Sequence, residues 1–189
     1  EDAAEQCEAI LNRMEIRGAS DVSIRPNLVA YVTTITAWSR TKAVHAASRA
    51  EDILNRMIDL YYDGDDIELP SLEGDVEHAK HDAPFNAVIT AYARSSDPHA
   101  AERAFAVLER LEASPIAPTA FTYNAAMDVC AKHGEPERAL QILEKMRDFS
   151  VTPDSTSYDT ILNAYARLEK SGSAERAWEL LRQWEEDYT

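Results

Sequence analysis

Polar side chains that could bind a ligand recur at a spacing of four residues in four segments of the chain. Three of the lines are Asn86, Thr90 and Arg94; Asn124, Asp128 and Lys132; and Asp159, Asn163 and Arg167. The matching line in the first segment is Val32, Thr36 and Arg40, whose first member is apolar. Because residues four apart share one face of a helix, each line would present hydrogen-bonding groups and a terminal positive charge together. Such a face suits recognition of a polar, anionic ligand.

The recurring cations have two explanations. Arg40, Arg94, Lys132 and Arg167 each end an expected helix. A cation in the last turn complements the helix dipole. Their recurrence on a face shared with amides instead favours contact with a series of anionic groups. The sequence leaves both explanations open.

The helices that would carry these lines repeat along the chain. Four similar segments begin at the aromatic residues Tyr31, Phe85, Tyr123 and Tyr158, which are separated by 54, 38 and 35 residues. Apolar residues follow at i+3, i+4 and i+7, as in Ala126, Met127 and Cys130 after Tyr123. This spacing predicts helices that bury one face.

A second apolar stripe follows each of these segments. The stripes are Ala50, Ile53, Leu54 and Met57; Ala104, Val107, Leu108 and Leu111; Ala139, Ile142, Leu143 and Met146; and Ala177, Leu180, Leu181 and Trp184. A similar stripe, Cys7, Ile10, Leu11 and Met14, opens the chain with no first helix before it. We therefore expect the chain to begin inside a repeat, as a piece of a longer protein. Trp38, Trp178 and Trp184 lie in or beside the stripes and are expected to pack.

Prolines and capping residues divide the chain into units. Pro26-Asn27, Pro118-Thr119 and Pro153-Asp154 each break the chain and offer an N-cap, while Gly134 and Pro136 indicate a helix end and a helix start. The expected organisation is one array over 1–189, with repeats at about 28–65, 82–119, 120–154 and 155–189. Each repeat would have a first helix with the aromatic residue and a second helix with the second stripe, and 1–27 would hold a second-type helix with no first helix before it. An acidic insertion is expected at about 61–82, with seven acids and one lysine between Asp63 and Lys80.

A single helix pair of this kind cannot bury its apolar face. Stacked pairs form a continuous core, so we expect an all-α protein, a right-handed α-solenoid superhelix of antiparallel helix pairs. The concave surface would be lined by the first helix of each pair.

The unit from Ala120 to Asp154 resembles a pentatricopeptide repeat. The similarity lies in its segments FTYNAAMDVCAKHG, ERALQILEKM and VTPD. The resemblance extends to nearly the whole chain outside the acidic insertion and is partial in the first unit. It implies sequence-specific binding of single-stranded RNA, about one base per repeat, in RNA processing, stability or translation in a mitochondrion or plastid.

The resemblance also implies roles for particular residues. The base-reading positions correspond to Asn86 with Thr119, Asn124 with Asp154, and Asp159. Asn124 with Asp154 resembles the family's uridine-reading pair, whereas Asn with Thr is not a standard combination. The first unit departs from the pattern because Val32 cannot form a hydrogen bond.

Further positions follow from the same resemblance. The residues that clamp a base correspond to Val29 and Phe121. The phosphate contacts correspond to Arg40, Arg94, Lys132 and Arg167. A net charge of −15 opposes RNA binding, although the acids are concentrated in the second helices and the insertion.

The sequence offers little for other chemistry. Five glycines include no phosphate-binding loop, no segment is long and apolar enough to span a bilayer, and no catalytic constellation stands out, so we expect no enzyme activity, cofactor or membrane partner. Asp75, Glu77, His78 and His81 could hold a metal, but they lie in the acidic insertion and more simply form a solvated loop. Cys7 and Cys130 are expected to be buried, reduced thiols.

The sequence also supports an alternative hypothesis, in which the chain binds a protein and not RNA. A helical solenoid can bind a peptide or a partner helix on its concave surface. The acidity of the chain, Val32 and the unequal repeat lengths favour this alternative. The partner would then be basic, such as an RNA-associated protein.

Overall fold

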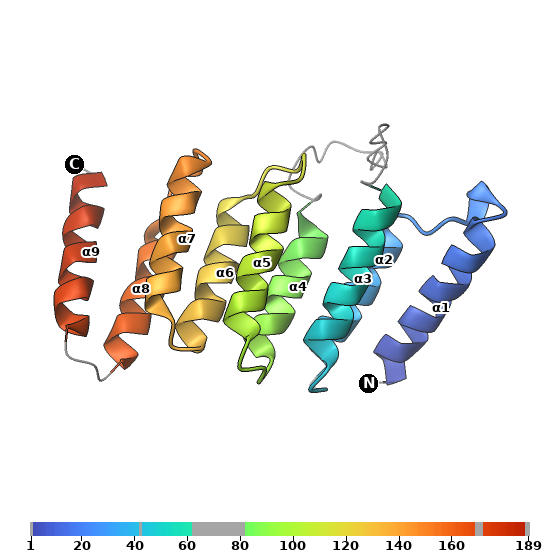
Figure 1. Cartoon of the computed structure of the whole chain (residues 1–189), viewed down its shortest axis with the longest axis horizontal. Coiled ribbons are helices and arrows are strands. Elements are labelled where there is room, and N and C mark those ends of the chain that lie inside the picture. Colours follow the sequence, from blue (N-terminus) through green and yellow to red (C-terminus); the bar gives the residue numbers. More distant parts are fainter. Residues whose placement is uncertain (1, 42, 62–81, 169–171, 188–189) are drawn as a thin grey trace. The chain divides into compact units, whose positions relative to one another are not determined.

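The computed structural model describes residues 2–41, 43–61, 82–168 and 172–187. In these ranges the chain forms helices and no strand, and it divides into two compact units, Glu1–Asp97 and Pro98–Thr189. Figure 1 shows the helices in chain order. The predicted all-α repeat class is confirmed. The predicted acidic insertion lies outside the described residues except at its two ends.

The first unit is built around one central helix. Its elements are α1 (Asp2–Gly18), the short 3-10 helix η1 (Val22–Ile24), α2 (Leu28–Arg40), α3 (Ala46–Tyr61) and α4 (Ala83–Arg94). Helix α2 packs against α1, α3 and α4, and α3 also contacts α4. The helices with the polar lines, α2 and α4, are therefore neighbours, and α3 packs on both.

The second unit repeats this arrangement. Its helices are α5 (Ala100–Glu112), α6 (Ala120–Lys132), α7 (Pro136–Asp148), α8 (Ser155–Arg167) and α9 (Ser173–Asp187). Helix α6 contacts α5, α7 and α8, while α8 also contacts α7 and α9. The boundary between the units falls between α4 and α5. The handedness of a superhelix stays a prediction.

Local sequence explains where several helices begin and end. The side chain of Asn27 accepts a hydrogen bond from the backbone N–H of Ala30 at 3.0 Å and caps α2. Asp154 caps α8 in the same way. Gly134 has a φ of +74°, which ends α6 in the left-handed conformation that glycine adopts without strain, and Pro136 begins α7.

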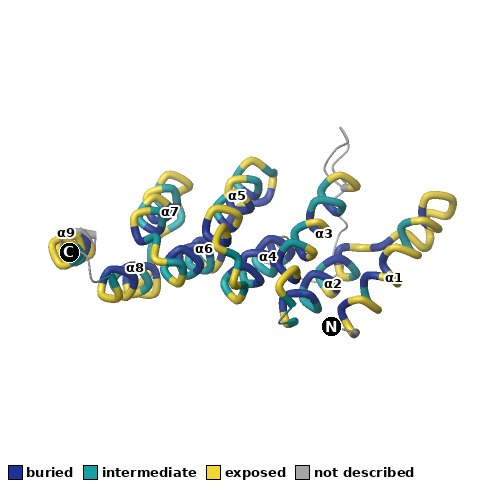
Figure 2. Tube along the Cα trace, turned by 60° about the horizontal axis from the view of Figure 1, so that its bottom comes forward, coloured by how far each residue is buried: buried dark blue, intermediate teal, exposed yellow. Residues whose placement is uncertain are grey.

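The apolar stripes form the core in each unit. The inner residues of α2 to α7 are buried, including Tyr31, Trp38, Tyr92 and Tyr123, as the blue segments of Figure 2 show. Burial also raises the pKa of the Cys130 thiol to about 12. Both cysteines are free thiols, and Cys130 is buried as predicted, whereas Cys7 is only half-buried.

The stripes of α1 and α9 are buried less completely than the sequence predicts. Ile10 is 57% exposed and Trp178 is 66% exposed, so the prediction that Trp178 packs in the core is wrong. Leu181 and Trp184 are also partly exposed, at 37% and 39%. The reason is that helix α9 packs along one side on α8, so residues around its circumference are not all covered.

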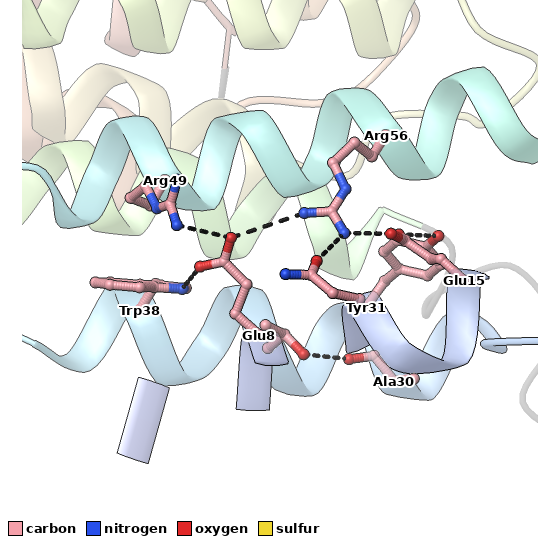
Figure 3. A network of polar contacts seen from close by, with 9 residues as sticks. Glu8, Glu15, Ala30, Tyr31, Trp38, Arg49 and Arg56 are labelled. Atoms are coloured by element: carbon pink, nitrogen blue, oxygen red, sulfur yellow. Dashed lines mark hydrogen bonds and ion pairs between the residues drawn. The ribbon is translucent and has the colours of Figure 1, made fainter. Parts of the chain in front are cut away.

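A buried carboxylate fixes α1 onto its neighbours. Glu8 is 6% exposed and accepts a hydrogen bond from the Trp38 indole at 2.9 Å. It also pairs with Arg49 at 3.0 Å and with Arg56 at 3.7 Å, both from α3. Figure 3 shows this network, which continues through Arg56 to Glu15. Burial of Glu8 is tolerated because each of its oxygens has a partner.

Candidate functional site

Two predicted site residues from neighbouring helices are joined by a hydrogen bond. Asn124 lies in the first turn of α6, and Asp154 is the N-cap of α8. The Nδ2 of Asn124 donates to Oδ1 of Asp154 at 3.1 Å. We call these two residues the reading pair. Contact between α6 and α8 brings together side chains that lie 30 residues apart in the sequence.

A serine completes this arrangement. Ser157, the third residue of α8, donates its hydroxyl to Oδ1 of Asn124 at 2.7 Å. Its backbone N–H donates to Oδ1 of Asp154 at 2.9 Å, and its hydroxyl accepts from the Asp154 N–H at 3.1 Å. The last two contacts form a capping box. The sequence analysis did not select Ser157, although a serine three residues after an N-cap aspartate is a recognisable capping signal.

The surroundings of Asp154 favour its charged form. Partial burial opposes ionisation, but hydrogen bonds from the Ser157 backbone, the Asn124 amide and the Ser157 hydroxyl outweigh that effect and lower the pKa of Asp154. The carboxylate is therefore an acceptor at neutral pH. Asp154 and half-buried Asn124 are accessible to a ligand, whereas Ser157 is fully buried.

The other predicted reading residues have different surroundings. Asn86 is half-buried in α4, and its Oδ1 is buried with no hydrogen-bond partner in the described chain. Thr119 belongs to the second unit, where its backbone N–H donates to the Thr122 hydroxyl at 3.4 Å. Asp159 is exposed on α8, and Val32 is half-buried on α2. Asn124 and Asp154, which both lie in the second unit, share a hydrogen bond.

The two predicted clamp residues are exposed despite being apolar. Val29 is 53% exposed in the first turn of α2, and Phe121 is 64% exposed in the first turn of α6. Phe121 precedes Asn124 by three residues, so the two lie on the same side of α6. An exposed phenyl ring beside the reading pair could stack on a planar group.

Two of the four predicted cations line one cavity. Arg40 and Arg94 lie at the ends of α2 and α4, around a cavity of about 450 Å³ that also reaches the start of α3. The Nη1 of Arg94 donates to the backbone oxygen of Ser39 at 3.4 Å. This contact places Arg94 at the negative end of the α2 dipole. Neither arginine pairs with a carboxylate in the described residues.

The other two cations differ from this pair. Lys132 forms an ion pair with Asp128, one turn earlier on α6, at 2.6 Å. Arg167 is exposed at the end of α8. The positive charge available to an anion is therefore greater at Arg40 and Arg94 than at Lys132, where a carboxylate already compensates it.

Metal-ligand clusters and membrane-spanning helices were two further possibilities for this sequence. The described residues contain no group of three or more metal-ligating side chains, and none of their helices is long and apolar enough to cross a membrane. The metal-ligand candidates Asp75, Glu77, His78 and His81 lie outside the described residues. The expectation about them stays a prediction.

Comparisons with known proteins point to one family. Residues 83–133 match the model of the pentatricopeptide repeat domain, and residues 118–167 match a model of the PPR repeat family. The two matches cover α4 to α8 and include Asn86, Thr119, the reading pair and Asp159. No match is found among curated proteins.

Proposed function

The chain carries pentatricopeptide repeats over residues 83–167, and from this premise we propose that it binds single-stranded RNA in a sequence-specific way. Each repeat contacts about one base through residues at the start of its first helix. The chain acts by binding, without catalysis or a cofactor. The place of action is a mitochondrion or plastid, where it serves RNA processing, stability or translation.

The observation that carries this proposal is the reading pair with its neighbouring aromatic ring. Asn124 offers an amide N–H, Asp154 offers a carboxylate oxygen, and Phe121 is 64% exposed on the same side of α6. A base could stack on the ring while its edge meets the donor and the acceptor. In this role the pair selects uracil, whose edge places a carbonyl oxygen beside an N–H.

The recurring cations supply the second part of the interface. Arg40, Arg94, Lys132 and Arg167 end the helices that carry the polar lines. They contact successive phosphates of the bound strand. The whole chain has a net charge of −15 and repels RNA phosphates at long range. The affinity therefore depends on the local contacts between cations and phosphates, which salt weakens strongly.

Fluorescence anisotropy tests the proposal. The chain is titrated into labelled single-stranded RNA of random sequence across a salt series, with DNA of matched length as the control. We expect RNA to bind more tightly than DNA, with a log–log salt slope of about −2 to −3, since each phosphate contact contributes about 0.7. Equal binding of RNA and DNA, or no binding at low salt, would contradict sequence-specific RNA recognition.

Exchanging the reading pair tests its specific role. The double variant Asn124→Asp/Asp154→Asn keeps the net charge, a helix cap and the means to form a hydrogen bond between the two side chains. It exchanges the donor and the acceptor offered to the base. We expect a changed base preference at one RNA position, measured by competition among four oligonucleotides, and an unchanged circular dichroism spectrum. An unchanged preference would argue against a reading role.

The acidity of the chain favours a second candidate function. Exposed acids lie on the second helices, including Glu137, Glu144 and Asp148 on α7. We propose as the alternative a scaffold that binds a basic, RNA-associated protein. If no RNA binds at low salt, capture of a defined basic peptide by the chain, abolished by salt, would support this alternative.

A further inference from the structure

We propose that Ser157 is a positioning residue for base recognition, because its hydroxyl holds the amide of Asn124 in one orientation. This inference rests on the proposed RNA-binding function and adds a third residue to the reading pair. Ser157 is 0% exposed, so it cannot touch a base. Its effect on specificity is exerted through Asn124.

The hydroxyl of Ser157 has one proton and several neighbours. Its shortest contact is Oδ1 of Asn124 at 2.7 Å. Oδ1 of Asp154 lies at 3.1 Å and Sδ of Met146 at 3.9 Å. The proton is therefore directed mainly to the amide oxygen, since a shorter O–H···O contact is the stronger one.

The amide is then held at both of its ends. Its oxygen accepts from Ser157, and its nitrogen donates to Asp154 at 3.1 Å. Rotating the amide by half a turn would place its oxygen against the Asp154 carboxylate, where two acceptors repel. It would also break the hydrogen bond from Ser157. Both contacts therefore select the same orientation.

This orientation determines what remains for a base. One N–H of Asn124 is engaged by Asp154, which leaves the second N–H as a donor. Oδ1 of Asp154 accepts from Asn124 and from the Ser157 backbone, and the Thr156 backbone N–H also donates to this carboxylate. The remaining lone pairs of Oδ2 are then the acceptors for a base. A fixed donor beside a fixed acceptor is complementary to the O4 and N3–H of uracil. A rotated amide would offer two acceptors, which do not match that edge.

An asparagine at the matching position shows that residue type alone does not determine the amide orientation. Asn86 occupies the first turn of α4, as Asn124 does in α6. Its Oδ1 is buried but accepts no hydrogen bond in the described chain. Within the first unit, the Asn86 oxygen therefore has no hydroxyl donor like the one that Ser157 gives to Asn124 within the second unit.

The test compares variants that remove or retain the hydroxyl. Ser157→Ala removes it, whereas Ser157→Thr retains it. Threonine fits such a position, since Thr122 is fully buried at the third residue of α6. Thr122→Ala serves as the matched control, because it removes the corresponding hydroxyl from the capping box of α6 instead of α8. Binding is measured by competition among RNA oligonucleotides that differ at the position opposite Asn124.

We expect the wild type, S157T and T122A to share the same ratio of uridine to cytidine binding. In S157A this ratio should fall about three- to tenfold, the effect of losing one hydrogen bond. If S157A unfolds the second unit, S157T and S157V repeat the comparison with side chains of nearly the same shape.

Two outcomes would overturn the role of Ser157 while leaving RNA binding intact. One is a wild-type ratio in S157A. The other is an equal fall in S157A, S157T and T122A, which would indicate general destabilisation. A wild-type chain with no base preference would instead overturn the proposed function, and the role of Ser157 with it.

Discussion

Asn124 and Asp154, 30 residues apart in the sequence, are joined by a hydrogen bond of 3.1 Å between the start of α6 and the cap of α8. The same carboxylate accepts the Ser157 N–H at 2.9 Å, so it caps α8 as well. The residues proposed to read a base therefore also connect α6 to α8. The effect of a substitution here on RNA recognition must be measured separately from its effect on stability.

Replacing the cap should reveal its contribution to folding. We expect Asp154→Ala to lower the free energy of unfolding by about 1 kcal/mol, the usual effect of losing an N-cap, and Asp154→Asn to lower it less. The pKa of Asp154 is lowered in the folded state from its ordinary 3.8, so the charge contributes stability above that pH. The stability contributed by the Asp154 charge should be lost as pH falls below 3.8.

Denaturant titrations between pH 7 and pH 2.5 would check this prediction. The difference between wild type and D154N should shrink with acidification, because both side chains are then uncharged. A difference that stays constant or grows at low pH would contradict a stabilising carboxylate.

Removing the exposed ring of Phe121 should affect RNA binding without affecting folding. Phe121 is 64% exposed, so Phe121→Ala loses little packing. Loss of one stacked base costs about 1–3 kcal/mol, and we expect RNA binding to weaken about tenfold. The control is Phe149→Ala, which removes an exposed ring at the end of α7. Equal losses of affinity in both variants would argue against a specific clamp.

The cations should contribute unequally to RNA binding. Arg40 and Arg94 share a cavity of about 450 Å³ and pair with no described carboxylate, whereas Lys132 is paired with Asp128 at 2.6 Å. We expect Arg40→Gln and Arg94→Gln each to reduce the salt slope by about 0.7. Lys132→Gln should reduce it less, since Asp128 already offsets the charge.

Anisotropy titrations at several salt concentrations give these slopes. Arg182→Gln on α9 is a control for the general loss of one positive charge, because Arg182 is exposed on a second-type helix. If R182Q changes the slope as much as R94Q, the arginines do not act as local phosphate contacts.

The buried carboxylate of α1 should be important for stability of the first unit. Glu8→Ala leaves the Trp38 indole N–H without its partner at 2.9 Å and removes an ion pair with Arg49. An unsatisfied buried donor costs about 1–3 kcal/mol, which thermal unfolding would detect as a lower Tm. Glu5→Ala, at an exposed position of the same helix, should change the Tm little. A similar Tm for both variants would contradict the role of Glu8.

Most of the helices could be predicted from local patterns. The stripe of Tyr123, Ala126, Met127 and Cys130 is buried as predicted, because spacing of three and four residues places them on one face of a helix whatever packs there. Asn27 and Asp154 cap α2 and α8 as predicted. Caps are predictable because the side chain and the backbone N–H that it binds are three residues apart.

The site could be predicted less completely. Sequence analysis selected Asn124 and Asp154, but it could not show that Ser157 donates to the same amide, since that contact depends on how α8 packs on α6. It also treated four cations as equivalent, whereas Asp128 compensates one of them.

The sequence by itself determined which residues form helices, where several of these begin, and which face of most helices is apolar. These features arise from interactions over three or four residues. Tertiary structure decided which side chains meet between helices, such as Glu8 with Trp38, and which apolar residues stay exposed, such as Trp178. The reason is that a stripe specifies a face suitable for burial, while the partner that covers it is supplied by another helix.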